Sequence, residues 1–88
     1  MRHARDQNLD RLDDLLAGLR ALPGLVEKKR GVFYLKGRAF LHFHEDPKGL
    51  FADIGAGAAG GEFERIDVTA PEGQEALLAR AAQRLAAR

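Results

Sequence analysis

Two histidines at alternating positions are the side chains of this 88-residue chain best suited to chemistry. In the segment His42-Phe43-His44, an extended backbone places both imidazoles on one side of a strand, with their Cα atoms about 7 Å apart. Metal sites use this spacing when a third ligand arrives from a neighbouring strand, and Asp53 is the candidate for that ligand. The pattern predicts a metal site at His42 and His44. The alternative is that both rings hydrogen-bond only to water or to Asp53 on a half-exposed sheet face.

Basic residues near the predicted turns form a second candidate site. Its members are Lys28, Lys29, Arg30 and Lys48. A basic edge of this kind meets the phosphates of nucleic acids, so these residues are the nucleic-acid candidates of the chain. Glu27, Glu45 and Asp46 lie in the same region and dilute its charge. Solvated loops with scattered charge are therefore the alternative.

The segment Gly55-Ala56-Gly57-Ala58-Ala59-Gly60 matches the glycine spacing of a dinucleotide-binding motif. That motif works by presenting the N-terminus of a helix to the pyrophosphate. Here the continuation, Phe63–Val68, alternates like a strand, and the chain is too short for a doubly wound sheet. We therefore expect a flexible hairpin loop at this position and predict no cofactor.

The composition excludes several classes of protein. The 14 Lys and Arg residues nearly balance 13 Asp and Glu residues, so no strong overall charge attracts nucleic acid or an anionic membrane. The absence of cysteine excludes a disulfide framework, a thiol nucleophile and a Cys-based zinc site. No stretch approaches the roughly 20 apolar residues that cross a bilayer. We expect one cytoplasmic domain over residues 1–88, with no membrane partner.

Leucine spacing and turn residues delimit two helices. Leucines recur every three or four residues along one stripe of Asp6–Ala21, which predicts an amphipathic helix there. The step Leu22-Pro23-Gly24 ends it, because the residue before a proline avoids the helical conformation. A second helix is predicted over Ala70–Ala87, where Thr69 and Glu72 have the spacing of a capping box.

Between the helices, short β-prone segments alternate with turn residues. The predicted strands are Leu25–Lys28, Val32–Leu35, Arg38–Glu45, Leu50–Ile54 and Phe63–Val68. Because the connections are short, neighbouring strands must pair antiparallel. The order predicts an α+β domain in which a helix, four to five antiparallel strands and a helix follow one another, with both helices on one face of the sheet.

Alternation along these strands defines a second sheet face that no helix is left to cover. We name it the open face, and its predicted interaction residues are Tyr34, Phe40, His42, His44, Phe51 and Asp53. Alternation along the last strand segment places Phe63, Arg65 and Asp67 on the same face. Exposed aromatic area on a sheet is unfavourable unless something covers it. We therefore expect the open face to bind a ligand or a partner, and a second copy of the chain, giving a homodimer, is one such partner.

Two short motifs resemble known families. The Leu22-Pro23-Gly24 step, the strand Phe33–Leu35 and the segment Lys36–Phe40 resemble the opening of the MmcQ/YjbR family. That family is described as predicted DNA-binding proteins with a double-wing motif, so the resemblance implies weak DNA binding. The same Leu-Pro-Gly step and the segment Gly37–His44 resemble small bacterial domains of unknown function that carry a luciferase-family label.

Taken together, the patterns favour a non-enzymatic binding or interaction domain that uses the open face. No Ser-His-Asp order is visible, and Thr69 is better suited to capping a helix than to acting as a nucleophile. Weak nucleic-acid binding through the basic residues and metal binding through His42 and His44 are the two alternatives.

Overall fold

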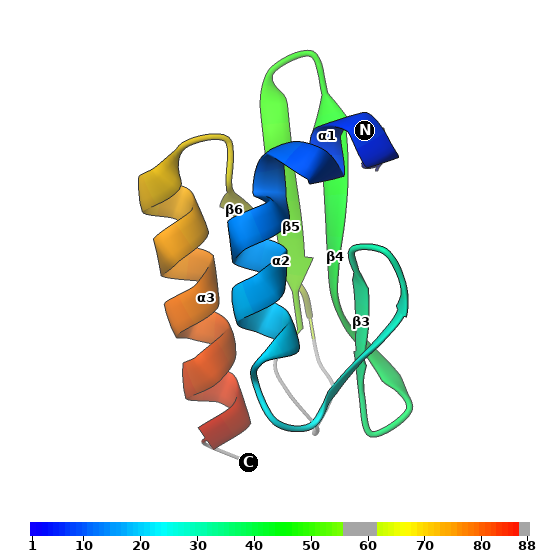
Figure 1. The fold of residues 1–88 in the computed structure, drawn as a ribbon, viewed down its shortest axis with the longest axis vertical. Helices are drawn as coiled ribbons and strands as arrows, with labels where there is room; N and C mark the ends of the chain where they lie inside the picture. Colours follow the sequence, from blue (N-terminus) through cyan, green and yellow to red (C-terminus); the bar gives the residue numbers. More distant parts are fainter. Residues whose placement is uncertain (56–61, 87–88) are drawn as a thin grey trace.

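The fold has two layers, a six-stranded antiparallel sheet and a pair of helices that cover one of its faces (Figure 1). The computed structural model describes residues 1–55 and 62–86, so most of the predicted glycine loop lies outside the described residues. The predicted α+β class and the order of helix, strands and helix are confirmed. None of the described helices is long and apolar enough to cross a membrane.

The N-terminal helical segment consists of three consecutive pieces and not one uninterrupted helix. They are α1 (Asp6–Leu9), a 3₁₀ turn (Asp10–Leu12) and α2 (Asp13–Arg20). The predicted leucine stripe faces the sheet, where Leu16 and Leu19 are fully buried. The C-terminal helix α3 (Pro71–Ala86) lies beside α2 on the same face (Figure 1). The amphipathic pattern therefore placed both helices correctly.

Five strands follow the predicted segments closely, and a sixth was not predicted. In chain order the strands are β1 (Arg2–His3), β2 (Leu25–Lys29), β3 (Val32–Leu35), β4 (Arg38–Asp46), β5 (Gly49–Ile54) and β6 (Glu64–Asp67). The sheet order is β2-β3-β4-β5-β6, and β1 pairs separately with β4. Lys36 and Gly37 join β3 to β4 with φ angles of 52° and 81°, the positive values of a tight two-residue hairpin turn.

A β-bulge in β4 moves Phe40, a predicted member of the open face, into the core. Phe33 pairs with Leu41 and Tyr34 pairs with Ala39, so Phe40 has no residue opposite it on β3. The extra residue resets the alternation of side chains along the strand. Phe40 is consequently only 1% exposed and belongs to the hydrophobic core, whereas Ala39 is exposed. The prediction that Phe40 lies on the open face is wrong.

The core fills the space between the helices and the inner face of the sheet. Phe33, Phe43 and Leu41 come from the central strands, and Leu16 and Leu77 meet them from the helices. These apolar side chains are almost entirely removed from water, and burying each one contributes roughly 1.5–3 kcal/mol to stability. This core fixes β4 and β5 as a rigid support for the side chains on the other face.

Candidate metal centre

Three potential metal ligands converge on the open face. His42 and His44 project from β4, and Asp53 projects from β5, where it pairs directly with His42. One ligand atom from each of the three side chains lies within 4.8 Å of the other two. We name His42, His44 and Asp53 the metal centre. The predicted pair of histidines and the predicted third ligand are thus brought together by the β4–β5 register.

The hydrogen bonds within the metal centre indicate where its protons lie. His42 Nδ1 is 2.8 Å from His44 Nε2, which is also 3.1 Å from Asp53 Oδ2. His44 Nδ1 is buried and has no hydrogen-bond partner among the described residues. A proton on Nδ1 would therefore be buried unpaired, which favours a proton on Nε2, where it is shared between His42 and Asp53. With the proton on His44 Nε2, His42 Nδ1 and Asp53 Oδ2 both direct a lone pair toward this atom.

Arg65 on β6 holds the third ligand in place. Its Nε donates to Asp53 Oδ1 at 2.8 Å and its Nη2 donates to Oδ2 at 3.0 Å, a bidentate arrangement. The Arg65 guanidinium lowers the pKa of Asp53 below its usual value, so this carboxylate is ionised at neutral pH. Burial lowers the pKa of His42, and the neighbouring His44 lowers it further, so the His42 imidazole is neutral there. Both groups are in the protonation state that a metal ion requires.

An aromatic ring borders the metal centre on one side. The ring centroids of Phe63 and His42 lie 5.2 Å apart, and Phe63 is 45% exposed. Neither Phe63 nor Arg65 was among the predicted site residues, although both lie on the predicted last strand segment. Alternation along that segment had placed both side chains on the open face, but it assigned neither of them a role there.

The remaining predicted members of the open face contribute less to this site. Tyr34 is half-buried, and Lys28 Nζ lies over its ring at 4.6 Å from the centroid. Phe51 is half-buried and pairs with His44 on one side and with Asp67 on the other. Phe40, as described above, is absent from this face. The centre of the open face is therefore polar, with aromatic side chains around it.

Contacts within the domain occupy two of the four nucleic-acid candidates. Arg30 forms ion pairs with the carboxylates of three aspartates, Asp6, Asp10 and Asp13. Lys28 lies against the Tyr34 ring. Lys29 is the last residue of β2, and Lys48 lies in the turn between β4 and β5. These three aspartates therefore largely neutralise the charge of Arg30 within the predicted basic edge.

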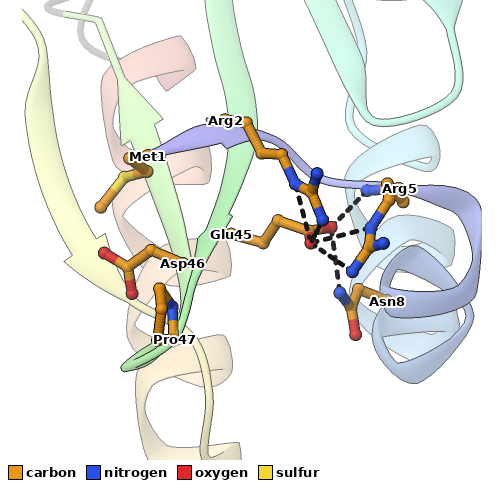
Figure 2. Close-up of a pocket in the computed structure, with 7 residues that line it drawn as sticks. All are labelled: Met1, Arg2, Arg5, Asn8, Glu45, Asp46 and Pro47. Carbon is orange, nitrogen blue, oxygen red and sulfur yellow. Dashed lines mark hydrogen bonds and ion pairs between the residues drawn. The ribbon is translucent and has the colours of Figure 1, made fainter.

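A second polar cluster lies on the helix-side face, where Glu45 points away from the metal centre. Figure 2 shows Glu45 surrounded by Arg2, Arg5 and Asn8. These residues line a cavity of about 550 Å³, together with Met1, Asp46 and Pro47. Glu45 accepts hydrogen bonds from the Arg5 backbone N–H at 2.6 Å and from Asn8 Nδ2 at 2.9 Å. These donors, together with the Arg5 guanidinium, lower the pKa of Glu45 to about 2.

This arrangement, which we name the Glu45 cluster, is structural in character. Glu45 is only 6% exposed, and its oxygens also accept from the guanidinium groups of Arg2 and Arg5. A carboxylate with this many donors has little capacity left for a ligand. The Glu45 cluster therefore connects β1 and α1 to the end of β4. From the sequence, Glu45 was considered only as an acidic residue that lowers the net charge of the predicted basic edge.

The fold and the site together define a two-layer α+β domain with three convergent side chains that could hold a metal ion on its uncovered sheet face. The chain matches no protein-family model, no curated protein and no solved structure. The geometry of the open face is thus the basis on which its function is inferred.

Proposed function

We propose that this domain binds a divalent transition-metal ion on its open face through His42, His44 and Asp53. The observation that supports this proposal is the convergence of two imidazole nitrogens and a carboxylate oxygen within 4.8 Å. Imidazole nitrogen suits Zn²⁺ and its neighbours in the first transition row, whereas Mg²⁺ and Ca²⁺ favour oxygen ligands. Zn²⁺ is therefore the appropriate probe.

The structure also indicates what would limit the affinity. An ion at His44 Nε2 replaces the proton that this atom shares with His42 and Asp53, and the neutral ring then carries its proton on Nδ1. Because His44 Nδ1 has no acceptor among the described residues, this step offsets about 1–3 kcal/mol of the binding free energy. We expect a site of moderate affinity that retains metal in solution but releases it to a strong chelator.

Calorimetric titration with Zn²⁺, together with elemental analysis after removal of free metal, tests the proposal. We expect one ion per chain for the wild type and loss of stoichiometric binding in His42→Ala and Asp53→Asn. Asp67→Asn is the matched control, because Asp67 is an exposed carboxylate on the same face that bonds the Thr69 backbone N–H. Wild-type protein without stoichiometric zinc, or His42→Ala with unchanged binding, would contradict the proposal.

A second candidate function is self-association through the same face. The exposed side chains of Phe63 and Val26, 45% and 55% accessible, support it, since Val26 pairs with Tyr34 on the uncovered side of the sheet. Sedimentation equilibrium in the presence of a chelator separates this candidate from metal binding. A homodimer that Phe63→Ser converts to a monomer supports self-association, and a monomer at all concentrations excludes it.

A further inference from the structure

We infer that the N-terminal strand β1 supplies a fourth ligand, His3, to the metal centre. This inference rests on the metal-binding function proposed above and assigns the part of the chain that completes the site. The chain contains three histidines, and the structure places all three on two paired strands, β1 and β4. His3 had no role in the sequence-based predictions.

The strand register carries the argument. His3 pairs directly with His44, and Arg2 pairs with Glu45. Directly opposed residues of an antiparallel pair project from the same face, with Cβ atoms about 5 Å apart. His3 therefore lies beside His44 on the open face, whereas Arg2 and Glu45 project to the other face. A third imidazole is thus adjacent to the metal centre, on the side of β4 opposite Asp53.

The Glu45 cluster holds β1 in this register from the other side of the sheet. The Ala4 backbone N–H donates to the Phe43 carbonyl at 3.0 Å and extends the pairing of β1 by one residue. Glu45 accepts from the backbone N–H of Arg5 and from the guanidinium of Arg2, as Figure 2 shows. A two-residue strand has little pairing energy of its own, so these bonds determine where His3 lies.

A fourth protein ligand changes what the site can do. Three protein ligands leave a coordination position open for water or substrate, as in catalytic zinc sites, whereas four close it, as in structural sites. With His3 the donor set becomes three imidazoles and one carboxylate. The domain would then retain or sense a metal ion and would not use it to activate water.

X-ray absorption spectroscopy of the zinc-loaded protein tests the inference by counting imidazole ligands. We expect three for the wild type and two for His3→Ala, with an affinity for Zn²⁺ at least about 10-fold lower in the variant. Lys48→Ala is the control, because Lys48 is an exposed residue of the turn between β4 and β5 that belongs neither to the metal centre nor to the Glu45 cluster, and this variant should keep three. Two imidazoles in the wild type would overturn the inference and leave the proposed function standing, and a wild type without zinc would overturn both.

The anchoring role of the Glu45 cluster gives an independent test. Glu45→Gln loosens β1 and should weaken zinc binding in the wild-type background, but should have no further effect once His3 is alanine. Glu27→Gln is the matched control, since Glu27 also accepts from an arginine, Arg20, and from a backbone N–H, that of Gly31. Equal effects of Glu45→Gln in the two backgrounds would contradict the coupling of β1 to the metal.

Discussion

Two buried carboxylates on adjacent strands have contrasting surroundings. Glu45 receives hydrogen bonds from a backbone amide, an asparagine and two arginines, and so acts as an anchor. Asp53 receives a bidentate bond from Arg65 but also faces His44 with one oxygen. In the proposed metal site, that oxygen would exchange its shared proton for the ion. The number of donors around each carboxylate therefore distinguishes a structural role from a binding role.

The lowered pKa of Glu45 predicts a specific loss of stability in acid. The pKa falls from 4.5 to about 2 because the native state bonds the ionised form. Its contribution to folding is complete above pH 4.5 and is lost as the pH falls toward 2. Urea unfolding should show Glu45→Gln less stable than the wild type at pH 6, with the difference shrinking between pH 4.5 and 2. A difference that is the same at pH 6 and pH 2 would show that the charge of Glu45 is unimportant.

At the scale of the elements, the bulge in β4 removes Phe40 from the open face and places it in the core. Phe40 is 1% exposed and Phe63 is 45% exposed, although alternation predicted both to share one face. We expect Phe40→Ala to lower the free energy of unfolding by about 3–5 kcal/mol, as for other large core residues. Phe63→Ala is the comparison and should cost about 1 kcal/mol or less. Similar losses for the two variants, measured by chemical denaturation, would contradict the observed register.

The packing of α3 against β6 requires glycine at one position. A Cβ atom at Gly73 would lie 1.9 Å from the Asp67 backbone carbonyl oxygen, whereas at Gly18 it would lie 2.9 Å from the flexible end of Leu78. Alanine at either position gains about 1 kcal/mol of helix propensity. We expect Gly73→Ala to be destabilising by at least about 2 kcal/mol, and Gly18→Ala to change stability by less than about 1 kcal/mol. Thermal unfolding of both variants measures the contrast, and a Gly73→Ala variant as stable as the wild type would exclude the close approach.

At the scale of the whole molecule, a bound ion in the proposed site would link three neighbouring strands of the sheet. In the proposed site, the ion would take ligands from β4 and β5, and His3 would add one from β1. A ligand that binds only the native state stabilises it by about 2.7 kcal/mol at a concentration 100 times its dissociation constant. Saturating Zn²⁺ should therefore raise Tm by about 10 °C or more in a domain of this size. The increase should vanish with a chelator and in His44→Ala, and an equal increase in that variant would indicate binding elsewhere.

The sequence alone determined the features that depend on neighbouring residues. Leucine spacing identified the helical segments, short turns required antiparallel pairing, and the period of two placed His42 and His44 on one side of β4. Each of these follows from local geometry, because a turn or a strand is specified within a few residues. The open face and its histidine pair could therefore be predicted before any tertiary contact was known.

Only the tertiary structure decided the features that depend on register between distant segments. No local pattern specifies the relative positions of residues that lie far apart in the chain. Three features depend on such positions: the bulge at Phe40, the pairing of β1 with β4 and the bond between Arg65 and Asp53. The Thr69 hydroxyl illustrates the same point, since it bonds the Leu50 backbone on β5. The helix α3 begins at Pro71, so Ala70 takes the capping position and the predicted helix cap at Thr69 is wrong. Such contacts form only when the whole core packs, because packing selects one register among several that local preferences permit.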